Sequence, residues 1–514
     1  MAFFCPHHRL RCILATMRRR TEIAPVVIAA LLAGVASASA QSAPLADRLP
    51  ADTVAYASWQ PRLVNPSNPL VALWTDPGFA PARAAVEQRL EQWIQKNSAL
   101  QGISAHELLA LGGHAAMLAG SRRLASGQRS LFFLAQAEDG VGRELLQRLA
   151  AAVRAPWRAG LNECGVLVAA STGAEFTNLS ARYRCGASPM AALATASVYQ
   201  QARAALGQPA AEVYVDLQRA IQTDASRPAT GRLRSQLHLE RIHAFVGGIG
   251  LSGPAAEFRT SALGDTSPGS LLDLFGANGR PSEWTTLRVL PPGASFEAFH
   301  LDLTALQRQM APVFDLVPAT PQAARASALV QGVLTLVQQI FTGEITLAWN
   351  HQPRSAADLV VAAVRNRQTL QNLLQTTLAP LVVPEGSNGD IALYRLASAP
   401  AAAGAAPLRL AVTPTLLVAG RDAEAVRRAA TSGLHPSAAP VESNQHVREL
   451  ESKLPPELLA LTYLNLDTMG WTIGPRPAAA APRVDPSVLR RHLHWLGGGA
   501  WRDAQGIHGR VWLH

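Results

Sequence analysis

The chain has 514 residues, of which 48% are hydrophobic and 16% are charged. This composition excludes a disordered chain, and the length exceeds what one hydrophobic core usually serves, so two globular domains of about 200 residues each are expected. The formal net charge is +10, but the basic residues are nearly all arginines and form no cluster with interleaved aromatic residues. We therefore expect no nucleic-acid partner.

The first 40 residues have the pattern of a secretory signal peptide. Arg18-Arg19-Arg20 is a basic region, Ile23 to Val35 is an apolar core, and Ala38-Ser39-Ala40 is a small-residue cleavage site. The apolar core is shorter than the roughly 20 residues of a spanning helix, which favours cleavage over retention as a membrane anchor. With Met17 as an alternative start, we expect residues 1–40 to direct a soluble protein to the periplasm, where it does not span the membrane.

Residues 41–263 are predicted to form a first module of strands and helices. Helices are indicated where apolar residues recur every three or four positions, as Val86, Leu90 and Ile94 do, and Ser104 with Glu107 has the spacing of a capping box. Short links between strands indicate antiparallel hairpins. The predicted strands are 53–59, 114–120, 130–136, 166–171 and 211–217, with a hairpin at 242–262, and the predicted helices include 141–153, 174–183 and 197–206.

Residues 283–514 repeat these elements in the same order, after a linker at 264–282 that is rich in Gly, Pro and Ser. Val166 matches Leu416 at an offset of 250, and Tyr214 matches Tyr463 at an offset of 249. Such a constant offset predicts an internal duplication. The expected fold class is α+β, with two similar modules, mixed or antiparallel sheets, and helices packed on one face. The stretches 397–407 and 475–486 are predicted surface loops.

Two cysteines remain after signal cleavage, Cys164 and Cys185. An even number of cysteines in an oxidising compartment favours a disulfide. The strand from 166 and the returning helix to 183 bring the two positions close together, whereas a metal site would need further ligands nearby. The offset places Pro414 and His435 at the corresponding positions of the second module, so the fold itself does not depend on the bridge.

Two further patterns admit a chemical and a structural interpretation. Gly248 to Gly253 has the G-x-G-x-x-G spelling of a dinucleotide site, but the residues from Glu257 indicate a strand instead of the helix that such a site needs. Asp216, Asp302 and Asn465 end equivalent strands and are interpreted as helix N-caps, a role in which Asp and Asn interchange.

The histidines of the two modules are a further candidate. His238 and His243 lie in the first module, and His492 and His494 in the second. His492 and His494 would chelate a metal if both rings pointed to one face of a strand. No acidic or thiol ligand is close in sequence, so we assign no metal, cofactor or catalytic residues.

The chain resembles a bacterial family of exported proteins catalogued as a domain of unknown function. The resemblance rests on the Leu49 to Tyr56 opening, the approach from Asn68 to Phe79, and the Tyr214-Val215-Asp216-Leu217 strand. It implies an extracytoplasmic location and a repeated α+β architecture. We expect a non-enzymatic binding or scaffolding protein that contacts an envelope protein or ligand at the seam between the modules. The alternative is a periplasmic hydrolase acting on a cell-envelope component.

Overall fold

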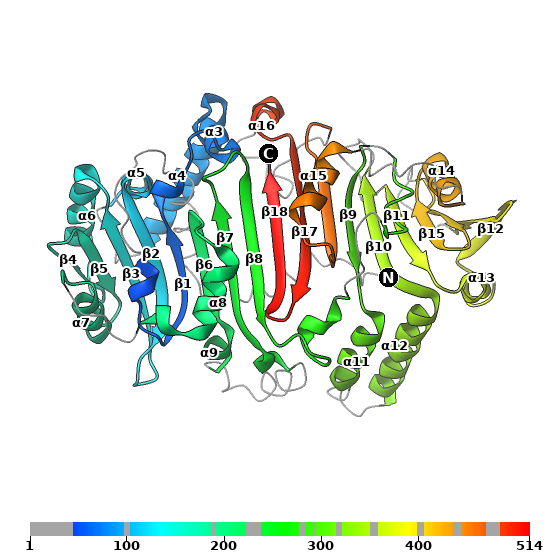
Figure 1. Ribbon diagram of the computed structural model, residues 1–514, viewed down its shortest axis with the longest axis horizontal. Coiled ribbons are helices and arrows are strands. Elements are labelled where there is room, and N and C mark those ends of the chain that lie inside the picture. The colour runs from blue at the N-terminus through cyan, green and yellow to red at the C-terminus, as the bar shows by residue number, and fades with distance from the viewer. Residues whose placement is uncertain are drawn as a thin grey trace. The chain divides into compact units, whose positions relative to one another are not determined.

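The computed structural model describes most of the chain after residue 44 (Figure 1). The chain forms two compact units. The described ranges are 45–96, 103–186, 192–222, 238–276, 283–291, 293–314, 321–349, 358–397, 406–434, 444–468 and 484–514. Unit 1 comprises Met1–Asp216, Val246–Ala256 and Arg476–Val488, and unit 2 comprises Leu217–Phe245, Glu257–Pro475 and Leu489–His514. The predicted signal peptide and most of the two predicted surface loops lie outside the described residues.

Unit 1 contains an antiparallel sheet in the order β4–β5–β3–β2–β1–β6. The strands are β1 (Thr53–Trp59), β2 (Ala115–Arg123), β3 (Arg129–Ala137), β4 (Arg158–Leu161), β5 (Val166–Ala170) and β6 (Ala211–Asp216). The helices are α3 (Pro69–Thr75), α4 (Ala80–Lys96), α5 (Ala105–His114), α6 (Gly140–Ala152), α7 (Gly173–Arg182) and α8 (Ser197–Leu206). The predicted capping box begins α5, because the Ser104 side chain accepts from the Glu107 amide and the Glu107 carboxylate accepts from the Ser104 amide.

Unit 2 contains an antiparallel sheet in the order β12–β13–β14–β15–β11–β10–β9–β16–β17–β18. Its strands are β9 (Ser295–His300), β10 (Phe341–Trp349), β11 (Leu359–Val364), β12 (Val382–Asn388), β13 (Ile391–Leu396), β14 (Arg409–Val412), β15 (Leu416–Gly420), β16 (Ala460–Asn465), β17 (Trp495–Asp503) and β18 (Gly506–Leu513). Its helices include α9 (Leu217–Gln222), α11 (Leu303–Phe314), α12 (Pro321–Ile340), α13 (Arg367–Gln375), α14 (Ala423–Leu434) and α15 (Gln445–Lys453). β7 (Ile242–Gly250), β8 (Ala256–Gly264) and α16 (Pro486–His492) each have residues in both units.

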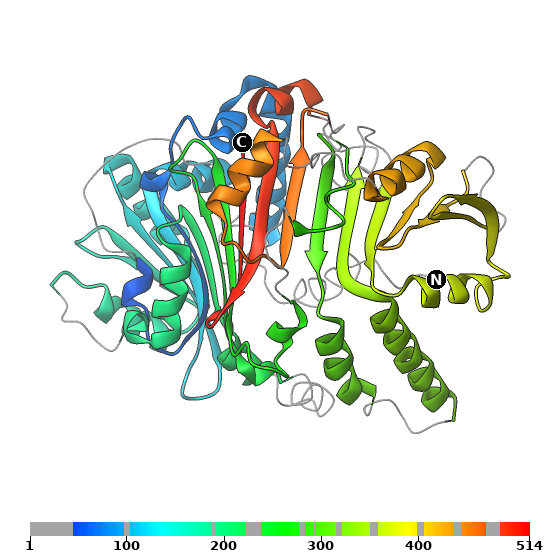
Figure 2. The ribbon, with the colours of Figure 1, turned by 45° about the vertical axis from the view of Figure 1, so that its right-hand side comes forward.

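Helices pack on one face of the unit 2 sheet at two places. α15 lies on β17, where glycines let the helix approach: a Cβ at Gly499 would come within 2.9 Å of Leu454. α14 lies on the same face of β15, with Val426 facing Gly420. Figures 1 and 2 both show α15 crossing β17 and α14 beside β15. These contacts agree with the predicted α+β class, in which helices pack on a sheet.

Both faces of the sheet are covered at β15, so the prediction that helices pack on one face is wrong at this strand. Leu417 and Ala419 point away from α14 and pack on a second hydrophobic core, to which α13 contributes Leu370 and Leu374. The β12–β13 hairpin contributes Val382 and Tyr394 to the same core. The physical reason is the continuous apolar run from Leu416 to Ala419, which must be buried on both sides.

Among the described residues, no helix is both long enough and apolar enough to cross a membrane.

Candidate functional site

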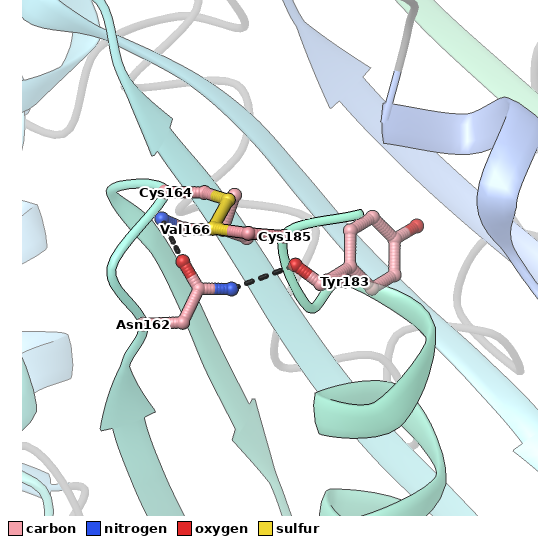
Figure 3. The surroundings of a disulfide bond; sticks show 5 residues. All are labelled: Asn162, Cys164, Val166, Tyr183 and Cys185. Carbon is pink, nitrogen blue, oxygen red and sulfur yellow. Dashed lines mark hydrogen bonds between the residues drawn. A yellow bond between two sulfur atoms is a disulfide. The ribbon is translucent and has the colours of Figure 1, made fainter. Parts of the chain in front are cut away.

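The predicted cysteine pair is brought together in unit 1. The Cα atoms of Cys164 and Cys185 are 5.8 Å apart, and Figure 3 shows the bond between their sulfur atoms. Asn162 ties the same two chain ends, because its side chain accepts from the Val166 amide at 2.9 Å and donates to the Tyr183 carbonyl at 2.7 Å. The pair therefore lies where the start of β5 meets the end of α7, which agrees with the proximity that the sequence predicts.

The glycine-rich segment at 248–253 is not followed by a helix. β7 ends at Gly250 and the next element is the strand β8, which begins at Ala256. A Cβ at Gly248 would come within 2.9 Å of the Pro209 side chain, so this glycine permits close packing. The segment offers no helix N-terminus to a pyrophosphate.

The three strand-end residues differ in their roles. Asp302 accepts from the amides of Thr304 and Ala305, each at 2.9 Å, which confirms it as the N-cap of α11. Asn465 accepts instead from the amide of Asp467 at 3.2 Å, within a turn. Asp216 is the half-buried last residue of β6.

The histidines also do not assemble as a metal site. His492 is the last residue of α16 and His494 precedes β17, so the two residues do not lie on one strand, which was the condition for a chelating pair. His494 lies 3.2 Å from Asp467, and His238 lies 3.2 Å from Glu240. No group of three or more His, Cys, Asp or Glu side chains within the described ranges could hold a metal ion.

Unit 2 contains a Ser–His–Asp arrangement that the sequence did not predict. Ser261 Oγ lies 2.8 Å from His508 Nδ1, and His508 Nε2 lies 3.0 Å from Asp503 Oδ1, although the latter contact lacks hydrogen-bond alignment. Ser261 is 3% exposed and His508 is 7% exposed. A nucleophile must reach its substrate, and this hydroxyl is buried, so the arrangement gives the hydrolase alternative no reactive group.

Unit 1 contains a second buried polar cluster. Tyr56 donates to Glu212, and Arg203 Nη1 lies 2.5 Å from the same carboxylate. Tyr199 completes the cluster with its hydroxyl 3.3 Å from that of Tyr56. Burial raises the pKa of Glu212 and of both tyrosines. Because Glu212 is 3% exposed and bonded on both oxygens, the cluster holds β1, β6 and α8 together instead of meeting a ligand.

The face of the unit 2 sheet opposite α15 and α14 is apolar and partly open. Cross-strand partners lie on the same face, so the pairing register defines two rows of side chains that run across seven strands. The first row is Ala419, Val360, Leu347, Glu297, Thr462, Gly498 and Val511. The second row is Leu417, Ala362, Ile345, Phe299, Ala460, Ala500 and Gly509. Leu417 and Ala419, at the β15 end of the two rows, pack on the second hydrophobic core, so we call the other 12 residues the open face.

Burial alternates between the open face and the covered face. All members of the open face except Gly498 are half-buried or exposed, and Val360 is 36% exposed. Their chain neighbours on the covered face, such as Val361, Thr346 and Leu461, are fully buried. Antiparallel sheets commonly present polar side chains on the face that meets water, so a row of aliphatic side chains there indicates a contact surface.

Glu297 is the charged residue of the open face. It lies on β9, the central strand of the seven, between Leu347 of β10 and Thr462 of β16. Its side chain is exposed, whereas the flanking members of the row are half-buried. A single carboxylate among aliphatic side chains favours a ligand that is mostly apolar and carries one cationic group.

Comparison with known proteins adds no relative, since no family model, no curated protein and no solved structure matches the chain.

Proposed function

We propose that the chain is an exported, non-enzymatic binding protein whose open face takes up an amphipathic helical segment with one basic side chain. The observation that carries this proposal is the apolar composition of the open face, interrupted at its centre by Glu297. The apolar rows would supply most of the binding free energy, at about 25 cal/mol for each Å² removed from water. Glu297 would fix the position of the segment through its cation.

The dimensions of the open face suit a helix. Strands lie about 4.8 Å apart, so the distance from β11 to β18 is about 24 Å. A helix of roughly 16 residues has this length at 1.5 Å per residue. The two rows are two residues apart along each strand, about 7 Å, which a helix about 10 Å across covers.

Export and duplication are part of the same proposal. The cysteine pair at disulfide distance supports an oxidising compartment such as the periplasm, in line with the signal-peptide pattern of residues 1–40. The order β4–β5–β3–β2–β1–β6 has the same sequence of pairings as β14–β15–β11–β10–β9–β16, which supports an internal duplication. The family resemblance points to the same architecture.

The binding proposal is tested by titrating the protein with a synthetic amphipathic helix of leucine and lysine, followed by calorimetry. Val360→Lys and Glu297→Arg each place a positive charge on the open face, and each is expected to weaken binding by about tenfold or more. Val383→Lys on β12 is the matched control, because Val383 is similarly exposed, at 39%, and lies outside both rows. Equal affinities for all four proteins would overturn the proposal.

A further inference from the structure

A second apolar surface of unit 2 lies on α12. Leu329, Val330 and Val333 are 69%, 42% and 50% exposed, which makes one turn of this helix the most exposed aliphatic group among the described residues. Arg325 is the charged residue of the entire helix, and its side chain is exposed. A helix with so little charge and an exposed aliphatic stripe is typical of a surface that meets a partner.

The exposed stripe faces away from the rest of unit 2. The opposite side of α12 is fixed to α11, because Gln307 donates to Thr335 at 3.0 Å and Gln338 donates to Thr304 at 2.8 Å. At 100° per residue, Val333 lies about 160° and Leu329 about 120° around the helix from Thr335. Arg325 lies one turn before Leu329 on the same stripe. Figures 1 and 2 show α11 and α12 adjacent to each other beyond the ends of β9 and β10.

The stripe and the open face complement each other in polarity, charge and size. The open face is aliphatic with one carboxylate, Glu297, and the stripe is aliphatic with one guanidinium, Arg325. α12 has 20 residues, about 30 Å of helix, against the roughly 24 Å between β11 and β18. We infer that α12 from a second copy of this chain is the segment that the open face binds, an inference that rests on the proposed function of that face.

A reciprocal exchange would close the assembly as a dimer. Each copy would give its α12 and receive that of its partner, so the two contacts would be equal and related by a two-fold axis. A typical stable interface buries about 1,600 Å² in total, of which each contact would supply about half. Because Arg325 and Glu297 meet in both contacts, a substitution at either residue would weaken both contacts of the dimer.

Charge reversal tests this inference through the oligomeric state of the full chain, measured by sedimentation velocity. The unaltered protein is expected to be a dimer, and Glu297→Arg or Arg325→Glu is expected to raise the dimer dissociation constant by at least about tenfold. The double variant, with both charges reversed, is expected to dimerise again. Arg428→Glu on α14 is the control, because Arg428 is an exposed helix arginine away from both surfaces. A monomeric unaltered protein would overturn the inference.

Cross-linking tests the register of the contact. In Arg325→Lys protein, a carbodiimide would join the new lysine to Glu297 as an amide. When ¹⁵N-labelled and unlabelled protein are mixed, cross-linked peptides that combine both isotopes are expected in a dimer. Cross-links within one isotope alone would show that α12 folds onto its own chain, and would overturn the inference.

The two proposals fail in different ways. A monomeric protein that still binds the leucine and lysine peptide, and loses it in Glu297→Arg, would retain the proposed function and refute the second copy as partner. A monomer that binds no peptide would refute both.

Discussion

Removal of the Cys164–Cys185 bridge should destabilise unit 1 by an amount that follows from its position. The two cysteines are 21 residues apart in the chain and 5.8 Å apart between Cα atoms. Closing a loop of this length removes about 11 cal/mol/K of entropy from the unfolded chain, which corresponds to about 3 kcal/mol at 25 °C. The Asn162 hydrogen bonds hold the same ends and should keep the folded geometry when the bridge is absent.

The assay is urea unfolding of the double variant Cys164→Ala, Cys185→Ala, followed by circular dichroism. We expect the free energy of unfolding of the transition that includes unit 1 to fall by about 3 kcal/mol. The unaltered protein in reductant should match the double variant, and reductant should not affect the variant further. A loss below about 1 kcal/mol, or free thiols in protein recovered from the periplasm, would refute the reasoning.

Three further predictions concern the packing and charge of the two units. Gly343→Ala should destabilise the protein, because Gly343 has φ +104° and a Cβ there would overlap a neighbouring carbonyl oxygen. Gly332→Ala on α12 places its methyl group in open space and should stabilise the protein by about 0.5–1 kcal/mol. Thermal unfolding measures both variants, and equal effects would contradict this account. Arg203→Met should cost about 3–5 kcal/mol in urea unfolding, because it leaves Glu212 buried without its cation, and a loss below about 1 kcal/mol would count against it. Burial raises the pKa of Glu175, so the folded state retains a proton that the unfolded state releases. The free energy of unfolding should therefore fall as the pH rises above about 4.3, the pKa of a glutamate in the unfolded chain. Glu175→Gln should remove that fall, and an unchanged pH profile in this variant would disprove the assignment.

Local patterns in the sequence predicted most of the strands and helices. Ser104 with Glu107 correctly placed the start of α5, and the apolar run from Val166 correctly placed β5, because both signals are made by residues a few positions apart. The cysteine pair followed from the same local elements. The N-cap interpretation was confirmed for Asp302, where a helix follows, and it stays a prediction for Asn465, because the residues after Thr468 lie outside the described ranges.

The functional surface depends on contacts that no local pattern encodes. Ser261 and His508 are 247 residues apart in the chain, so their meeting requires the sheet order. Along β10, Ile345, Leu347 and Trp349 alternate with Glu344, Thr346 and Ala348, which by itself predicts that the apolar side faces the core and the polar side faces water. The structure shows the reverse, because Thr346 is fully buried with its hydroxyl 2.6 Å from that of Thr286, whereas Leu347 is half-buried on the open face. α12 was missed as a separate element because it has few capping or charge signals.

The most direct test of the open face is a methyl NMR titration, with the leucine and lysine peptide, of the full-length Arg325→Glu protein, in which α12 of a second copy is expected not to occupy the face. The methyl signals of Ile345, Leu347 and Val360 are expected to shift, because these side chains line the two rows. The signals of Val361 and Val418, buried on the covered face, are expected to stay in place. Shifts confined to other parts of the chain, or no shifts at saturating peptide, would contradict the claim that this face is a binding surface.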